Sequence, residues 1–333
     1  MPEMNTVNTT QTLTRPTRRG AAAPRPERPA VIAGTRPSRS SSAADVVLAY
    51  LRVHAHALRT LESSVEAGEF DSVHQMRVAT RRLRATLRSF GQVIPRTDSE
   101  HLAGELQWLG QTLGRARDGE VLAGHLRDSL APIPPELLIG PVQARVQGHY
   151  APLRAAAQAE LIEALDSPRY HRLLAELDRV TAGPPRGPRA EAPAADVLPP
   201  AVRRAYRQAA RRMRHARHTP AGPARDAALH QARKSARRAR YAAEAAAPAV
   251  GHPARRFARQ MKRVQAVLGD HQDAVLARRA ARDLGIAAHL AGENAFTYGL
   301  LLERELHHAG QLQADARRIW KRASRPKYRR WMN

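Results

Sequence analysis

A stretch near residue 80 carries basic residues at a spacing suited to anion binding. The segment from His74 to Phe90, HQMRVATRRLRATLRSF, contains five arginines, one histidine and no acidic residue. At about 100° per residue in a helix, every basic residue except Arg82 falls on one stripe, made of His74, Arg77, Arg81, Arg84 and Arg88. Like charges three and four residues apart repel one another. The stripe therefore predicts that a ligand supplies the counter-charge.

A second stripe of the same helix is apolar and predicts the face that packs on a core. It consists of Met76, Thr80, Leu83, Leu87 and Phe90. An amphipathic pattern of this period is typical of a helix at the surface of a helical protein.

The basic motif occurs twice in the chain. HQMRVATRRLR, from His74, matches HQARKSARRAR, from His230, in the His-Gln pair, the next arginine, the Arg-Arg pair and the final arginine. Downstream, LGRARD from Leu113 matches LGDHQD from Leu268. The repeat predicts an internal duplication with two pseudo-symmetric halves. Such a pair of halves would turn both basic stripes towards one central groove.

Residues around the second motif are even more basic. Between 203 and 240 there are 13 Lys or Arg and one acid, Asp226. A charge-assisted arginine–phosphate hydrogen bond contributes about 1.5–3 kcal/mol, so a linear polyanion would bind firmly here. We expect Tyr241 and Glu244 to pack against and orient the arginines.

Other residues near the two motifs are expected to be structural. Asp118 and Asp273 would accept hydrogen bonds from the stripe arginines or cap a turn, because a carboxylate is unfavourable beside phosphate. Gly114 and Gly269 indicate close packing between helices.

The composition narrows the class of partner. Among 333 residues, 55 Lys and Arg exceed 30 Asp and Glu, giving a net charge of +25 and a pI near 11.5. So large an excess indicates a polyanionic partner, and arginine holds phosphate oxygens bidentately. The absence of cysteine excludes disulfides and thiolate metal sites. No apolar run is long enough for a membrane helix, so no membrane partner is expected.

The pattern along the chain predicts an all-α fold, a helical bundle with a basic central groove. Residues 1–42 have the composition of a disordered basic arm. Residues 43–322 form the helical domain, with a first half over 43–181, a proline-rich linker over 182–200 and a second half over 201–322. Helix breaks are expected at 219–223 and 248–253. Residues 323–333 complete the chain as a basic tail.

Signals for an enzyme or a metal site are lacking in the sequence. It shows no glycine-rich phosphate loop, no carboxylates paired for magnesium and no nucleophile–base pair. The closest histidine clusters are 54–56, 215–218 and 307–308, and none has the paired histidines and acid of a zinc helix. We therefore expect no catalysis, no metal and no cofactor.

These motifs resemble those of the CHAD family, the conserved histidine α-helical domain. The family pattern of His, Arg, a further basic residue, Arg-Tyr and Glu is matched at His230, Arg233, Arg237, Arg240, Tyr241 and Glu244. The resemblance extends over residues 43–322. It implies a bundle of two pseudo-symmetric halves whose basic central surface binds inorganic polyphosphate. Some members are fused to a CYTH domain, but this chain has no strand-rich segment and no ExExK-like run. It therefore resembles a stand-alone, non-catalytic member.

The resemblance also assigns site residues by position. In the first half the ligand-facing residues would be His74, Arg77, Arg81 and Arg84, and in the second half His230, Arg233, Lys234, Arg237 and Arg240. Periodicity alone adds Arg88, Arg207, Arg211 and Arg214. Arg117 and Asp118 fit the Arg-Asp pair of the family, whereas the second copy has Gln272 and Asp273, so the role of that arginine is not duplicated.

The function predicted from the sequence is non-catalytic binding of inorganic polyphosphate in a groove lined by Arg, Lys and His. A cytoplasmic location is expected, and family members are often associated with polyphosphate granules. The alternative is a nucleic-acid-binding protein that uses the same surface and tails non-specifically. Proteins that read DNA mix Asn and Gln with Arg, whereas these stripes are almost purely basic. A third hypothesis, an enzyme acting on phosphorylated substrates, requires one His or acid essential for turnover. The oligomeric state and the preferred chain length stay open.

Overall fold

All regular structure in the computed structural model is helical, over the residues that it describes, 38, 40–183 and 187–333. In these ranges no strand forms, and the only β-type pairing is an isolated antiparallel bridge between Ser42 and Pro193. The all-α prediction is confirmed. The predicted arm over 1–42 lies outside the described residues except at its last few positions.

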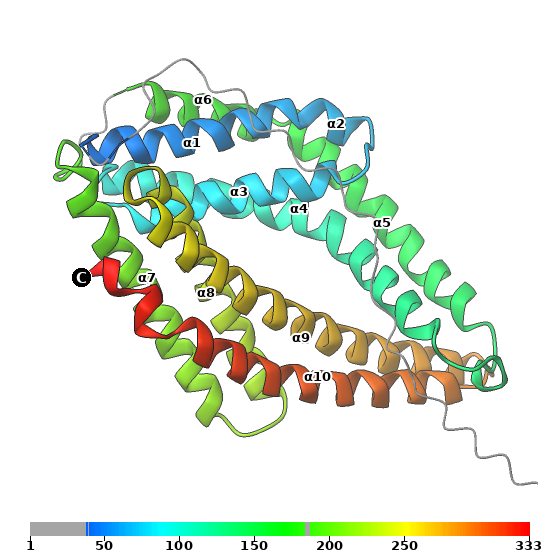
Figure 1. Cartoon of the computed structure of the whole chain (residues 1–333). Helices are drawn as coiled ribbons and strands as arrows, with labels where there is room; N and C mark the ends of the chain where they lie inside the picture. Colours follow the sequence, from blue (N-terminus) through cyan, green and yellow to red (C-terminus); the bar gives the residue numbers. More distant parts are fainter. Residues whose placement is uncertain (1–37, 39, 184–186) are drawn as a thin grey trace, which may run out of the picture. The chain divides into compact units, whose positions relative to one another are not determined.

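The first half contains a set of helices that surround its basic motif (Figure 1). They are α1 (Ala43–Thr60), α2 (Glu62–Glu66), α3 (Ser72–Ser89), α4 (Arg96–Leu130), the 3-10 turn η1 (Pro135–Leu137), α5 (Val142–Asp166) and α6 (Pro168–Ala182). The helix with the basic motif, α3, packs against both α1 and the long α4, and α4 in turn packs against α5.

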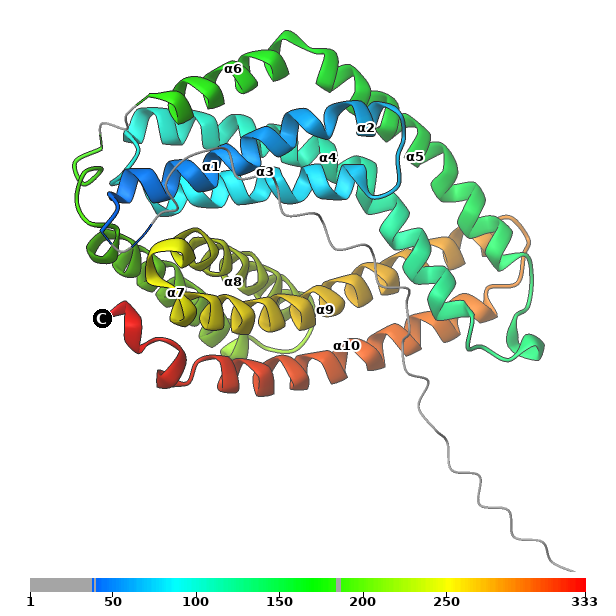
Figure 2. The same cartoon turned by 45° about the horizontal axis from the view of Figure 1, so that its top comes forward.

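The second half repeats this order of neighbours. Its elements are α7 (Ala194–His218), α8 (Pro223–Val250), α9 (His252–Leu290), α10 (Phe296–Ala323) and the 3-10 turns η2 (Pro326–Tyr328) and η3 (Arg330–Met332). The second motif lies on α8, which packs against α7 and the long α9, and α9 packs against α10. Across the halves, α3 contacts α8 and α4 contacts α9 (Figure 2). The internal duplication itself stays a prediction from the sequence.

Local sequence explains where the helices that carry the motifs begin and how they pack. Ser42 caps α1: its side chain accepts a hydrogen bond from the Asp45 amide at 3.1 Å, and the Asp45 carboxylate accepts one from the Ser42 amide. On α3 the predicted apolar stripe is buried in the main core, and Met76 and Leu83 are fully inaccessible. Burial of this stripe turns the basic stripe of α3 away from the core.

A second core joins the far ends of the two halves. It is formed by side chains of α4, α5, α9 and α10, among them Leu126, Tyr150, Leu284 and Leu301. Burial of these side chains in one cluster holds α4 beside α9 at this end. This contact fixes the relative position of the two helix pairs that carry the motifs.

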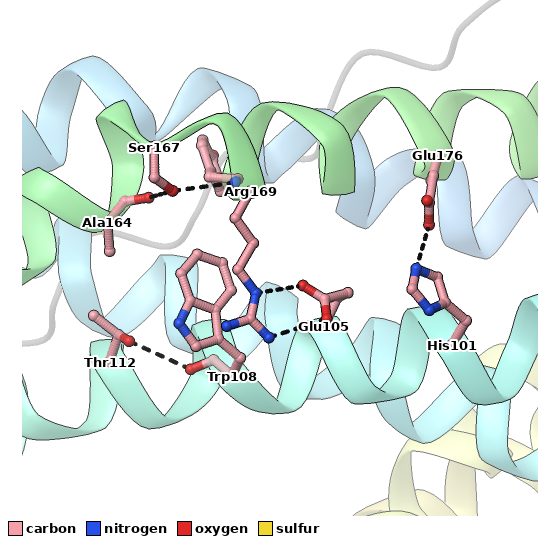
Figure 3. A network of polar contacts seen from close by, with 9 residues as sticks. His101, Glu105, Trp108, Thr112, Ala164, Ser167, Arg169 and Glu176 are labelled. Carbon is pink, nitrogen blue, oxygen red and sulfur yellow. Dashed lines mark hydrogen bonds and ion pairs between the residues drawn. The ribbon is translucent and has the colours of Figure 1, made fainter.

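Polar contacts attach α6 to α4 on the outer side of the first half (Figure 3). The Arg169 guanidinium donates two hydrogen bonds to Glu105, at 2.7 and 3.0 Å, and lies 4.3 Å from the centre of the Trp108 ring. His101 lies 3.2 Å from the Glu176 carboxylate along the same pair of helices. The charged groups of these pairs neutralise one another, and they lie apart from the basic stripe of α3.

The predicted linker over 182–200 is wrong in its second half. Helix α7 begins at Ala194 and continues through Pro199 and Pro200. A proline removes one backbone donor and disfavours helix for the residue before it. Here Val197 and Leu198 are buried in the main core, and this burial offsets the loss at about 25 cal/mol per Å² of apolar surface.

The two predicted helix breaks are confirmed, whereas the predicted basic tail is wrong as a separate segment. The breaks lie between α7 and α8 and at Gly251, whose φ of 81° favours glycine. Helix α10 continues to Ala323, and the following 3-10 turns fold back onto α7 and α9. Tyr328 and Met332 are buried in the main core. Apolar residues interleaved with the basic ones hold this segment in place.

Candidate functional site

The basic stripes of α3 and α8 meet at one open pocket of about 520 Å³, which we call the central pocket. Helices α3, α4, α7 and α8 form its walls. Eight cationic side chains line it: Arg77, Arg81, Arg84, Arg88, Arg212, Lys234, Arg237 and Arg238. The other polar lining side chains are glutamines and hydroxyl groups, and no acidic side chain is among the described residues that line it. The pocket thus presents donors and positive charge, and among the described residues only Arg77 of these eight is paired with an acid, Asp118, which lies outside the lining.

Burial and mutual repulsion make these charges costly in the free protein. Burial, followed by the charges of Arg81 and Arg233, lowers the pKa of Arg237 to about 9, so this guanidinium is still charged at neutral pH. Burial is also the main cause that lowers the pKa of Arg81 and that of Lys234. A bound anion would offset the cost of burial and repulsion for the charged forms of all three groups.

Several guanidinium groups also keep unpaired donors. In the part of the chain that the structure describes, the buried Nε atoms of Arg81, Arg84 and Arg237 have no hydrogen-bond partner. A buried donor left unpaired costs about 1–3 kcal/mol. Packing therefore helps to hold these three arginines, whereas other donors of the pocket arginines bond the protein, as Arg77 does to Asp118 and Arg238 does to the Arg88 carbonyl oxygen.

Glycines on the facing helices make room for two motif arginines. A Cβ on Gly114 would lie 3.5 Å from the Arg77 guanidinium, and one on Gly269 would lie 3.2 Å from that of Arg233. The sequence indicated close helix packing at both glycines. The structure shows that an arginine side chain, rather than a neighbouring backbone, fills the space at each of them.

Comparison with known proteins supports the family suggested by the motifs. The model of the CHAD domain family matches residues 49–282, which is more than half of the chain. The chain belongs to the CHAD family. Two proteins of Mycobacterium tuberculosis, the uncharacterized proteins MT2285 of strain CDC 1551 and Rv2226 of strain H37Rv, are each 35% identical to it over 291 residues. These residues are 86% of this chain and 55% of each relative, so the chain spans about half the length of these relatives.

Two solved structures share the CHAD fold of this chain. The CHAD domain of the plant Ricinus communis superposes with a TM-score of 0.62 and 25% identity, covering 85% of this chain and 92% of that domain. PptA from Streptomyces chartreusis superposes with a TM-score of 0.66 and 21% identity, covering 85% of this chain and 99% of PptA. The second likeness shows the fold alone.

Within this CHAD domain, Arg240 is one of several predicted ligand-facing residues that do not line the central pocket. Arg240 donates to Glu244 at 2.6 Å and to Gln265 at 3.3 Å, and it lines a separate pocket of about 300 Å³. Glu244 also pairs with Arg82, at 3.3 Å. The guanidinium groups of both arginines lie over the Tyr241 ring. We call Arg82, Arg240, Tyr241 and Glu244 the Glu244 cluster. The prediction that Tyr241 and Glu244 orient arginines is confirmed.

The acids of the two motifs differ in their contacts. Asp118 accepts a hydrogen bond from Arg77 at 2.7 Å, as predicted for a stripe arginine. Arg117 of the family's Arg-Asp pair donates to Glu120 at 2.6 Å and does not line the central pocket. Burial raises the pKa of Asp273, against the opposing charge of Arg233. Acids thus lie near one end of the basic stripes but not in the central pocket.

The two motif histidines do not line the central pocket in this CHAD domain. Burial is the first cause that lowers the pKa of both His74 and His230, and neighbouring basic residues lower it further. Arg233 is not in the lining either, and its buried Nε has no hydrogen-bond partner among the residues that the structure describes. The assignment of these three residues as ligand contacts stays a prediction.

The arginines predicted on α7 line further pockets of the domain. Arg207 and Arg211 line an open pocket of about 610 Å³ together with Arg88, Arg204 and Arg238; we call it the α7 pocket. Arg214 lies apart, in a pocket of about 270 Å³ beside Arg217 and Arg329. Periodicity thus finds basic residues of α7 correctly but does not show which of them share a pocket.

Two cationic lining residues of the central pocket were missed by the sequence analysis. Arg238, the second member of the Arg-Arg pair, donates to the Arg88 carbonyl oxygen at 2.5 Å and contacts Gln208. Arg212 reaches the pocket from α7. Both lie off the stripes that the helical period defines, and only the packing of α7 beside α8 and α3 brings them in. The repeated Arg-Arg pair was the one sequence signal that pointed to Arg238.

Proposed function

We propose that this CHAD protein binds inorganic polyphosphate in the central pocket and does not turn it over. One observation carries the proposal: cationic side chains from α3, α7 and α8 line a single pocket that no described acidic side chain enters. A chain with a negative charge on every unit matches such a surface along its whole length. Membership of the CHAD family supports the same ligand.

The binding mechanism follows from the state of the arginines in the free protein. Arg81 and Arg237 are close enough for each charge to disfavour the other, and both are largely buried. Phosphate oxygens would replace this repulsion with charge-assisted hydrogen bonds. Ligand binding should therefore also stabilise the fold, by about 2.7 kcal/mol at a polyphosphate concentration of 100 times the Kd.

The lining of the pocket also supports a role without catalysis. Phosphoryl transfer needs metal-holding carboxylates or a base beside the phosphate. Among the described residues of the pocket lining there is neither a carboxylate nor a histidine. The side chains present can hold phosphates, and the proposal assigns them no other task.

The decisive variant removes the two most buried charges of the pocket while keeping polar side chains. For Arg81→Gln with Arg237→Gln we expect the affinity for long-chain polyphosphate to fall at least about 100-fold, since two charge-assisted contacts are lost. Titration calorimetry measures the affinity, and circular dichroism checks that helicity is unchanged.

A matched control separates the pocket from net charge. Arg279→Gln with Arg304→Gln removes the same charge from exposed positions of α9 and α10 that line none of the pockets described above. Its affinity should stay within about twofold of the wild type. An equal loss in both double variants, or full affinity in the pocket variant, would contradict the proposal.

A competition with duplex DNA of matched total charge tests the nucleic-acid alternative. Salt weakens both complexes by counterion release. Polyphosphate should stay bound at a salt concentration that strips the DNA, because the pocket is shaped for bare phosphate chains. If both are released together, the affinity reflects net charge alone.

We also propose that the protein is cytoplasmic and is found at polyphosphate granules, as the family resemblance implies. The Arg81→Gln with Arg237→Gln variant provides the test in cells. A fluorescent fusion of the wild type should form foci that coincide with granules, and the double variant should be diffuse.

A further inference from the structure

Three basic pockets of this domain adjoin one another. The central pocket shares Arg88, Gln208 and Arg238 with the α7 pocket. The α7 pocket in turn shares Arg207 with a third pocket of about 180 Å³, which we call the C-terminal pocket. Its lining consists of Arg203, Tyr206, Arg207, Pro326, Arg329, Arg330, Met332 and Asn333. The shared residues show that the three pockets are neighbours, and at each place where two of them meet at least one arginine borders both.

The C-terminal pocket is formed by folded structure. Tyr328 and Met332 are buried beneath the 3-10 turns η2 and η3, and the Trp331 indole donates to the Tyr328 carbonyl oxygen at 3.0 Å. The Arg329 Nε donates to the Ser324 carbonyl oxygen at 3.0 Å, and its guanidinium lies 5.5 Å from the centre of the Tyr206 ring. The basic residues of this segment are thus held against α7 (Figure 1).

The spacing of arginines on α7 suits a ligand that runs along this helix. Arg203, Arg207 and Arg211 are four residues apart and follow one another at about 6 Å per step along the axis. Arg207 borders both pockets and so lies where the path passes from one to the other. No acidic side chain is among the described residues that line either pocket.

From this continuity we propose that the C-terminal pocket is an extension subsite for long polyphosphate chains. The chain would leave the central pocket at Arg88, follow the α7 pocket to Arg207 and end on Arg203 and Arg330. This inference rests on the proposed function of the central pocket, because the extension adds contacts to a chain already bound there.

The same path is poorly suited to nucleic acid. Single strands gain much of their affinity by stacking bases on aromatic side chains. The α7 pocket has no aromatic side chain among its described lining residues, and Tyr206 of the C-terminal pocket is already covered by Trp320 and Arg329. A bare phosphate chain needs only the row of cations that these walls present.

The test compares two ligands and two double variants of the full chain. Arg203→Gln with Arg330→Gln removes two charges of the C-terminal pocket. Arg322→Gln with Arg325→Gln removes two exposed charges from the same region of the chain but outside the pockets. Tripolyphosphate is too short to follow the whole path, so its tightest binding step in a calorimetric titration is expected to report the central pocket, which has the larger number of cations. Titration with long-chain polyphosphate reports the whole path.

We expect the first variant to lose affinity for long-chain polyphosphate by about tenfold or more and to keep the wild-type affinity for tripolyphosphate. The control should keep both affinities. The salt dependence of long-chain binding should also become shallower, by about one in the log–log slope for each contact removed. The single variant Arg330→Gln, at an exposed side chain, should show a smaller loss of the same kind if the double variant folds poorly.

Other outcomes overturn the extension. Unchanged long-chain affinity means that the C-terminal pocket is not used, and an equal loss for both ligands means that the variant acts on the central pocket or the fold. An equal loss for duplex DNA means that the path holds any polyanion. If the wild type binds neither polyphosphate, the proposed function itself fails, which is distinct from each of these results.

Discussion

The two copies of the basic motif show how one pattern of residues serves two purposes. In the first copy Arg84 is followed four residues later by Arg88, and both line the central pocket. In the second copy Arg240 is followed at the same spacing by Glu244, and the two form an ion pair at 2.6 Å. At this position the first copy has a basic residue and the second an acidic one. The arginine of the first copy therefore stays available to a ligand, which we call the open region, whereas that of the second is neutralised within the protein, which we call the closed region.

The surroundings of the two regions reinforce this difference. Arg84 donates to Gln107, a neutral acceptor that leaves its charge uncompensated. In the Glu244 cluster, the carboxylate is shared by two arginines and also accepts from the Tyr50 hydroxyl at 3.5 Å. The same residue type is therefore structural where an acid is supplied internally and available for binding where it is not.

The largest expected effect comes from removing the carboxylate charge of the Glu244 cluster. Glu244→Gln leaves Arg82 and Arg240 without a counter-charge in a partly buried place, and it should lower the free energy of unfolding by about 3 kcal/mol. Urea denaturation measures the loss. Adding Arg240→Gln should recover part of it, since the uncompensated charge is then removed. If the single variant is as stable as the wild type, the cluster has no structural role.

The second largest effect is a pH dependence of stability that reports how completely His54, beside the Glu244 cluster, is shielded from solvent. Burial, and then the charge of Arg82, lowers the pKa of His54 to about 3. The unfolded chain takes up this proton below about pH 6.5 and the folded chain does not, so stability is retained above pH 6.5 and falls as the pH drops towards 3. Between pH 6.5 and 5 the loss should be about 2 kcal/mol.

Thermal unfolding against pH measures this dependence, with a matched pair of variants on one helix. His54→Leu should flatten the fall, whereas His56→Leu, at an exposed position of α1, should leave it unchanged. A fall of equal steepness in His54→Leu would show that the other histidines with lowered pKa values, such as His271, dominate the acid response.

The smallest effect comes from giving the first motif copy the acid that the second copy has at Glu244. Arg88→Glu places an acid four residues after Arg84, so a like-charge repulsion becomes an attraction worth about 0.3–0.5 kcal/mol in stability. The affinity for polyphosphate should fall by about tenfold, since one pocket contact is lost and a carboxylate is added. Arg88→Gln is the control and should lose less. An unchanged affinity in Arg88→Glu would place the ligand away from the shared edge of the central and α7 pockets.

Part of the candidate site could be predicted because it depends on one helix at a time. The period of the apolar residues set which face of α3 is buried, and this left Arg77, Arg81 and Arg84 on the opposite side. The family, the all-α class and the helix breaks follow from equally local signals. The prolines of α7 and the basic tail misled the same reasoning, because burial of Leu198 and Tyr328 outweighs local propensity and charge.

What the sequence by itself determined is the supply of charge: two repeated basic stripes, too few acids to neutralise them and an apolar face that turns each stripe outwards. Only the tertiary structure decided which cations share a pocket. Arg212 of α7 and Arg238 of α8 line the central pocket, whereas Arg240 pairs with Glu244 outside it. Arg330 lines the C-terminal pocket together with residues of α7. The physical reason is that a helical period orders side chains around one axis, whereas a pocket is enclosed by several helices whose relative positions depend on the burial of their apolar faces.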